Sequence, residues 1–193
     1  HLQPVPDSGD ATAPALDPAV GGTPGLTPPV VRGRSSGFVT DVLVDLGYVA
    51  DDPARRAIEA ARTAGRPPEM LLLEQGVISP DQLSRATAER YGLDHVDLAV
   101  YHVDVAAAAL FPVTMARRYM AVPVGYVDQH TLLVAAADPA NVLAGDDIQI
   151  ATGLDCHIAV AAKADVGALL GRLGDVDLHV CGLALEGDDL VRG

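Results

Sequence analysis

The sequence predicts an α+β fold, in which an N-terminal four-helix module of two helical hairpins is followed by a small three-stranded α/β subdomain. Three observations predict it. A helix–glycine–helix unit occurs twice between residues 36 and 92, with an offset of 29 residues. Two apolar segments, 121–127 and 131–137, flank a short polar turn and indicate a β-hairpin. A third apolar segment, 156–161, lies between two segments with helical spacing.

Each repeat ends its first helix at a glycine. This offset pairs Leu43 with Leu72 and Gly47 with Gly76. Glycine adopts the left-handed conformation that ends a helix without a Cβ penalty. We expect the apolar residues Val49 and Ile78, two positions later, to pack under these turns.

The second helix of each repeat has an N-terminal signal. Asp52-Pro53 and Ser79-Pro80 each combine an N-cap oxygen with a proline at the first helical position. Beyond them, apolar residues recur at helical spacing, so both repeats should fold as helical hairpins.

Composition divides the chain into four parts. Residues 1–35 hold seven of the 14 prolines and predict a disordered leader, because they cannot bury enough surface to offset the entropy of ordering. The helical module covers 36–92 and the α/β subdomain covers 93–174. Residues 175–193 are predicted to be an exit linker with a weak strand at 178–183.

Charge and hydropathy exclude several classes of function. The net charge of −13 disfavours nucleic acid and anionic membranes as ligands, and it favours a partner with a basic patch. No apolar run has the length of a bilayer-spanning helix, which predicts no direct membrane insertion. Cys156 and Cys181 both lie in apolar segments, so a disulfide framework is not expected and a reducing cytoplasm fits.

Catalytic motifs are weak. Lys163 is the only lysine and no glycine-rich phosphate-binding loop precedes it, so this chain by itself is not expected to be an ATPase of that class. Residues 33–37 spell Gly-x-Ser-x-Gly, but a proline-rich segment precedes them where a nucleophile elbow needs a strand. The pairs His95/Asp97 and His102/Asp104 lack a second matching pair, so no metal site is predicted.

A series of short motifs in the sequence order of one known family extends over residues 36–173. These motifs are Gly76–Leu83, Tyr91–Leu93, Val96–Leu98, Phe111–Pro112, Ala121–Val124, Leu133–Pro139 and Thr152–Gly153. In this order and spacing they resemble the amino-terminal domain of type II secretion and type IV pilus assembly ATPases (MshEN-like).

The resemblance implies a non-catalytic domain ahead of a hexameric motor. Such a domain docks on the cytoplasmic part of an inner-membrane platform protein, which would place this chain in the cytoplasm, peripheral to the inner membrane. The other implied partner is a C-terminal ATPase domain of the parent chain. Similar domains also occur on envelope glycosyltransferases.

Some members of the family bind cyclic di-GMP through two copies of a motif. The motif opens with Arg-Leu-Gly, continues with a leucine and a glycine, and closes with glutamine. This sequence keeps only Leu43, Gly47, Leu72 and Gly76 of the motif.

The openers and the closing positions of both motif copies differ. The openers are replaced by Phe38-Val39-Thr40 and Pro67-Pro68-Glu69, and the closing glutamines by Ala61 and Arg90. Arginines displaced from the motif remain as candidate substitutes, namely Arg34, Arg66 and Arg90. Two interpretations stay open. The retained residues are core and cap residues of a docking module with no cofactor, or they belong to a degenerate cyclic di-GMP site.

Overall fold

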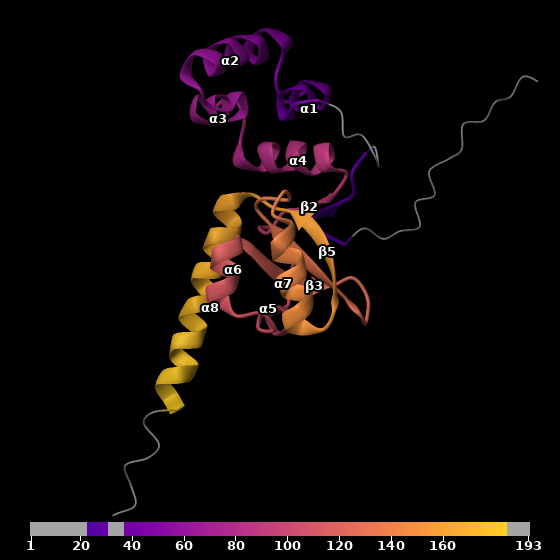
Figure 1. Cartoon of the computed structure of the whole chain (residues 1–193), viewed down its shortest axis with the longest axis vertical. Coiled ribbons are helices and arrows are strands. Elements are labelled where there is room, and N and C mark those ends of the chain that lie inside the picture. The colour runs from indigo at the N-terminus through magenta and orange to yellow at the C-terminus, as the bar shows by residue number, and fades with distance from the viewer. Residues whose placement is uncertain (1–22, 31–36, 185–193) are drawn as a thin grey trace, which may run out of the picture.

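The computed structural model describes residues 23–30 and 37–184, without the side chains of Val142 and of 175–184. Figure 1 shows two layers along the long axis. The helical module lies at one end, and a sheet with its covering helices lies below it. The last helix runs along one side of the sheet and points away from the module.

The helical module consists of two repeats that interlock. Its helices are α1 Val39–Asp45, α2 Asp51–Ala64, α3 Pro68–Glu74 and α4 Pro80–Tyr91. Helix α1 packs mainly against α4, and α2 packs mainly against α3. Each repeat therefore buries its apolar face largely against the other repeat. Small and branched side chains form this core, namely Val39, Leu43, Val49, Ala54, Ala57, Leu72, Ile78 and Ala86.

The predicted glycine turns are confirmed. Gly47 has φ 73° and Gly76 has φ 68°, both in the left-handed region. Val49 and Ile78 are buried beneath these turns. The peptide N–H after each glycine donates to a carbonyl of the preceding helix, which completes the helix end.

The start of α4 is confirmed, whereas the predicted start of α2 is wrong by two residues. Ser79 caps α4, and its hydroxyl accepts from the backbone N–H of Gln82 at 3.1 Å. Helix α2 begins at Asp51 with Ala50 as its N-cap, so Asp52 lies inside the first turn. Backbone N–H groups in the first turn have no partner within the helix, so Pro53, which lacks an N–H, is tolerated there. The helix dipole favours the carboxylates of Asp51 and Asp52 at the same end.

The α/β subdomain contains five strands rather than the predicted three. In chain order they are β1 Leu26–Thr27, β2 Asp94–Val96, β3 Ala121–Tyr126, β4 Thr131–Ala136 and β5 Asp155–Val160. The strand order in the sheet is β1-β2-β5-β4-β3. The hairpin β3–β4 is confirmed, and β5 adds to β4 in parallel through α7, Val142–Thr152.

Strand β1 corrects the prediction of a fully disordered leader. Leu26 pairs with Val96, and the backbone N–H of Val30 donates to both carboxylate oxygens of Glu89, at 2.9 and 3.1 Å. A two-residue strand has no periodicity of its own, and its partner strand lies about 70 residues later in the sequence. Residues 1–22 and 31–35 of the predicted leader lie outside the described residues.

Three further helices complete the subdomain: α5 Val105–Ala108, α6 Val113–Tyr119 and α8 Lys163–Ala184. The prediction of an exit linker with a strand at 178–183 is wrong for the residues up to Ala184, because α8 continues through them. A strand there would need a partner edge, whereas a helix satisfies its own backbone hydrogen bonds. Among the described residues, no helix has the length and apolar character of a bilayer-crossing segment.

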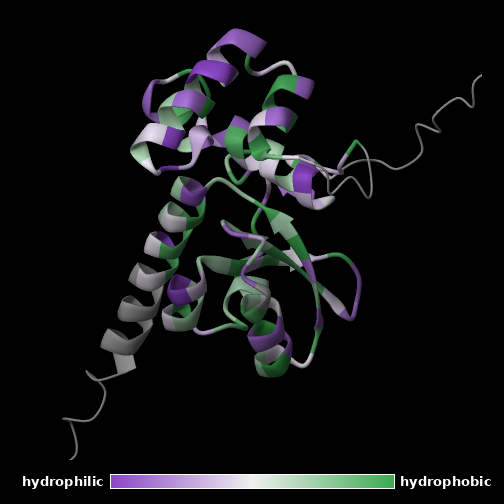
Figure 2. Ribbon diagram, turned by 45° about the horizontal axis from the view of Figure 1, so that its top comes forward, coloured by the Kyte–Doolittle hydropathy of each residue, from purple (hydrophilic) through white to green (hydrophobic). Residues whose placement is uncertain are grey.

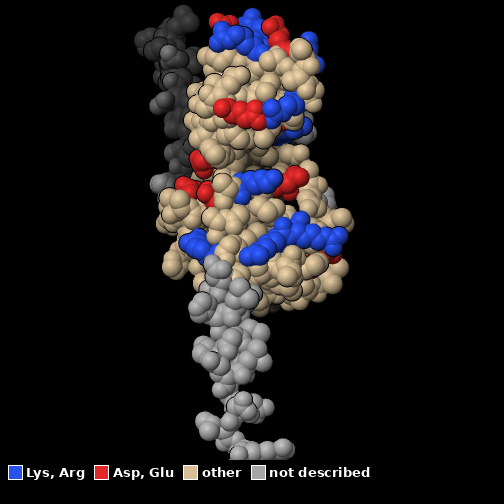
Figure 3. Space-filling model, turned by 90° about the vertical axis from the view of Figure 1, so that its left-hand side faces the viewer, with Lys and Arg blue, Asp and Glu red and all other residues tan. Residues whose placement is uncertain are grey.

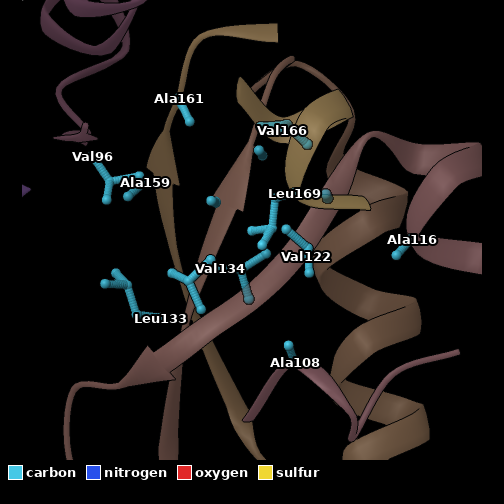
Figure 4. Close-up of a cluster of buried hydrophobic side chains, with 14 of the residues drawn as sticks. Val96, Ala108, Ala116, Val122, Leu133, Val134, Ala159, Ala161, Val166 and Leu169 are labelled. Carbon is cyan, nitrogen blue, oxygen red and sulfur yellow. The ribbon is translucent and has the colours of Figure 1, made fainter. Parts of the chain in front are cut away.

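The sheet and its helices enclose a second core, separate from that of the module. Figure 4 shows Leu169 of α8 beside Val122 of β3 and Val134 of β4. In Figure 2 the strands are mainly hydrophobic in colour, while the outer turns of the helical module are mainly hydrophilic. The sheet core therefore holds β3, β4 and β5 under α8, and α4 joins it to the module through contacts with β2 and β5.

Candidate functional site

Two grooves border the helical module at positions related by the repeat. Groove 1, a cavity of about 570 Å³, is lined by Phe38, Thr40, Asp41, Ile58, Ala61, Arg62, Arg66 and Pro68. Groove 2, about 780 Å³, lies between the module and the start of α8 and reaches Lys163. Four pairs of lining residues are 29 positions apart, namely Phe38/Pro67, Thr40/Glu69, Asp41/Met70 and Ile58/Thr87. The grooves are thus repeat-related sites, of which only groove 2 extends to the α/β subdomain.

Groove 1 brings together both ends of the first motif copy. Phe38 and Thr40 of the opener lie in the same cavity as Ala61, the closing position. Groove 2 contains Pro67 and Glu69 of the second opener, but Arg90 does not line it. The Arg90 guanidinium lies 5.4 Å from the centroid of the Tyr91 ring instead. Arg66, which lines groove 1, and Arg90 therefore do not converge on one site.

The residues retained from the motif have structural positions. Leu43 is 0% exposed and Leu72 is 1% exposed, both in the module core. Gly47 and Gly76 form the helix-ending turns, and a Cβ at either position would meet no atom within 4 Å. None of the four lines groove 1 or groove 2. Arg34, the remaining predicted substitute, lies outside the described residues.

The charges of groove 1 are largely balanced. Arg66 donates to Glu74 through both terminal nitrogens, with Nη1 at 3.0 Å from Oε2. This hydrogen-bonded pair lowers the pKa of Glu74 and raises the pKa of Arg66. Asp41 accepts the backbone N–H of Phe38 at 2.9 Å. Arg62 forms no ion pair with any side chain that the structure describes, and it is the cation of groove 1 that remains available.

Thr40 contributes a buried hydroxyl to groove 1. The residue is 1% exposed, and its Oγ1 has no hydrogen-bond partner in the described part of the chain. Threonine stands here at the position of the motif's glycine. Sequence reasoning missed Thr40 and Arg62 as site residues. The repeat offset alone identifies the opener, but only the packing of α1, α2 and α3 brings Arg62 beside it.

The buried Ser84 and His95 and the exposed Asp81 form a polar cluster where α4 meets β2. Ser84 Oγ lies 3.0 Å and Asp81 Oδ1 lies 3.3 Å from His95 Nε2. Burial lowers the pKa of His95, against the opposing effect of Asp81. Both partners approach the same imidazole nitrogen, so the aspartate cannot orient the ring for proton transfer from the serine. The cluster connects α4 of the helical module to β2 of the sheet. No group of three or more metal-ligating side chains occurs among the described residues.

Charge is unevenly distributed over the surface. Figure 3 shows cationic and anionic side chains mixed over the upper part of one face, and a mainly cationic band below, where α8 leaves the subdomain. Helices α6 and α8 carry exposed arginines, namely Arg117, Arg118 and Arg172. The net charge of −13 therefore does not dictate the sign of every surface that a partner meets.

Comparisons with known proteins agree with these features. Residues 91–180 match the MshEN domain family. The type IV pilus assembly ATPase PilB of Myxococcus xanthus is 26% identical over 137 residues, and that of Thermus thermophilus is 31% identical over 113 residues. These matches cover 71% and 58% of this chain. They span only 24% and 13% of the two relatives.

A solved structure of MshE with cdg, the abbreviation for cyclic di-GMP, is 27% identical. It superposes with a TM-score of 0.58, covering 72% of this chain and 99% of the MshE chain. The part of this chain that superposes is longer than the α/β subdomain, so it also includes part of the helical module. Residues 91–180 thus match the MshEN domain, and by motif order, fold and these relatives the chain is similar to the amino-terminal domain of the type II secretion and type IV pilus assembly ATPases.

Proposed function

We propose that this chain is a non-catalytic docking and regulatory domain that binds the cytoplasmic part of an inner-membrane platform protein. Its place would then be the cytoplasm, held at the inner membrane through that partner. The parent chain would carry the ATPase domain, so the motor and the platform are its two partners. Neither nucleic acid nor direct membrane insertion has a role in this proposal.

Exposed apolar side chains carry the proposal. Phe38 is 72% exposed, and Leu143 and Ile150 of α7 are 65% and 81% exposed. Leu143 and Ile150 are seven residues apart and lie on one side of α7. Large apolar groups left at the surface are typical of protein-binding sites.

The test is direct binding to the cytoplasmic domain of the platform protein from the same organism. We expect saturable one-to-one binding by isothermal titration, with no requirement for nucleotide. The test variant is Ile150→Ser, in the exposed apolar surface, and its matched control is Thr63→Ser, on an exposed polar surface. An absence of binding at the highest soluble concentration of both proteins would contradict the proposal.

A second candidate is a cyclic di-GMP sensor with a degenerate motif, on a secretion motor or an envelope glycosyltransferase. Two observations favour it: the grooves are repeat-related, and the MshE structure contains cdg. The geometry of groove 1 disfavours it. Phe38 replaces the motif's arginine, and Thr40 adds side-chain atoms where the motif has glycine.

Titration with cyclic di-GMP separates the two candidates. The sensor requires binding that Arg66→Ala or Arg90→Ala weakens, whereas the docking domain gives no heat at millimolar ligand. The triple variant Phe38→Arg, Thr40→Gly, Ala61→Gln restores the motif residues in groove 1. We expect this variant to gain affinity that the unmodified chain lacks. Equal affinity of the two proteins would show that these three departures do not decide nucleotide binding.

A further inference from the structure

Groove 1 has the composition of a protein-binding groove. Ile58, Ala61 and Pro68 form apolar walls, and the exposed Phe38 ring stands beside them. An aromatic side chain next to an apolar concavity is a common anchor in protein interfaces, because it buries a large area at little cost in conformational entropy. The groove is therefore suited to an apolar side chain of a partner.

Its polar groups define what else the occupant must provide. The buried Thr40 hydroxyl has no partner in the described part of the chain. Buried hydroxyls are normally hydrogen-bonded, so rotation of the Thr40 side chain toward the groove would let an occupant that offers a donor or acceptor satisfy it. The backbone of an extended peptide offers both along its length.

Charge decides how many negative groups fit. Glu74 already neutralises Arg66, and the Asp41 carboxylate also lines the groove. Arg62 alone has no acidic partner among the described side chains. A cyclic dinucleotide brings two phosphates to this single available cation. One carboxylate matches it.

We infer that groove 1 binds a segment of a partner protein that places one apolar side chain against Phe38 and Ile58 and one carboxylate at Arg62. This inference rests on the proposed docking function and specifies its site. It also gives the motif departures a physical role. Phenylalanine and alanine at the two ends of the motif make the cavity apolar, and threonine supplies one hydrogen-bonding group.

The chain contains only two phenylalanines, which makes a selective probe available. Phe38 stands at groove 1, and Phe111 is 2% exposed in the sheet core. Labelling both with 4-fluorophenylalanine gives two ¹⁹F resonances, which Phe38→Leu assigns. On titration with the platform protein's cytoplasmic domain we expect the Phe38 resonance to shift or broaden, while that of Phe111 stays in place.

Two variants measure the contribution of the groove. We expect Phe38→Asp and Arg62→Glu each to weaken platform binding by at least about tenfold, the loss typical of a central interface anchor. Met70→Asp is the matched control in groove 2, since Met70 is the repeat equivalent of a residue in groove 1. It should change affinity by less than about twofold.

The outcomes separate this inference from the proposed function. If the platform domain binds but the Phe38 resonance and the affinity of Phe38→Asp are unchanged, docking occurs elsewhere and the inference is wrong. If the platform domain does not bind, the proposed function fails, and the second probe is the peptide acetyl-Leu-Glu-Leu-Glu-Leu-amide. A Phe38 shift with this peptide that Arg62→Glu abolishes supports the groove, and no shift at millimolar peptide overturns it.

Discussion

Ser84→Ala tests the joint between the helical module and the sheet. The Ser84 hydroxyl donates to the carbonyl of Asp81 at 2.8 Å, and its oxygen lies 3.0 Å from His95 Nε2. A hydroxyl that donates to a carbonyl has its lone pairs free to accept, so we assign a proton to His95 Nε2. His95 is 4% exposed, and alanine at position 84 removes the acceptor.

The expected magnitude follows from burial. A buried donor left without a partner costs about 1–3 kcal/mol. The Asp81 carboxylate, at 3.3 Å, remains as a longer substitute acceptor and reduces the expected loss to about 1–2 kcal/mol. For a domain of this size, that loss lowers Tm by roughly 2–8 °C.

Urea unfolding followed by far-UV circular dichroism at pH 7.5 measures the loss. The control is Thr63→Ala, because Thr63 donates to the Glu59 carbonyl at 3.4 Å on the exposed side of α2. That bond is dispensable and alanine favours a helix, so its effect should stay within about 0.5 kcal/mol. If Ser84→Ala changes stability no more than Thr63→Ala does, then Ser84 does not satisfy His95 and the tautomer assignment is wrong.

Three further predictions concern stability, measured by urea unfolding for the leucine and glycine variants and by thermal unfolding for the histidine variant. Leu43→Ala should destabilise the protein by about 3–5 kcal/mol, because Leu43 is 0% exposed in a small core, and a loss below about 1 kcal/mol would contradict its assignment as a core residue. Burial lowers the pKa of His95 below its ordinary 6.5, so the unfolded chain binds the proton first. The contribution of His95 to stability is therefore complete above about pH 6.5 and declines as the pH falls below it, and His95→Gln should reduce the difference in Tm between pH 7.5 and 5.5. Gly47→Ala should cost about 1–2 kcal/mol through its positive φ alone, while Gly171→Ala in α8 should be neutral or stabilising; equal effects would refute the backbone argument.

Local patterns were sufficient wherever a feature depends on neighbouring residues. Gly47 and Gly76 end helices because of their own φ preference, and Ser79-Pro80 begins a helix because the cap and the proline act within one turn. The hairpin at 121–136 was readable for the same reason, since its two strands pair across a short turn. Motif order across the chain was enough to indicate the family.

Features that depend on distant partners were not predictable. Strand β1 exists because the edge of β2 provides hydrogen bonds to Leu26 and Thr27, and α8 continues to Ala184 although the sequence at 178–183 also fits a strand. A segment of that kind has no strong preference of its own, so its environment decides its conformation.

The candidate site divides in the same way. The sequence alone shows the repeat and its offset, and it shows that the motif's arginine, glycine and glutamine residues are lost. Only the packing of α1, α2 and α3 places Phe38, Thr40 and Arg62 in one groove, pairs Arg66 with Glu74, and leaves Arg90 beside Tyr91 instead. The reason is physical: spacing along a helix determines which face a side chain occupies, but the partner of that face and the charges left unpaired are set by contacts between segments far apart in the chain.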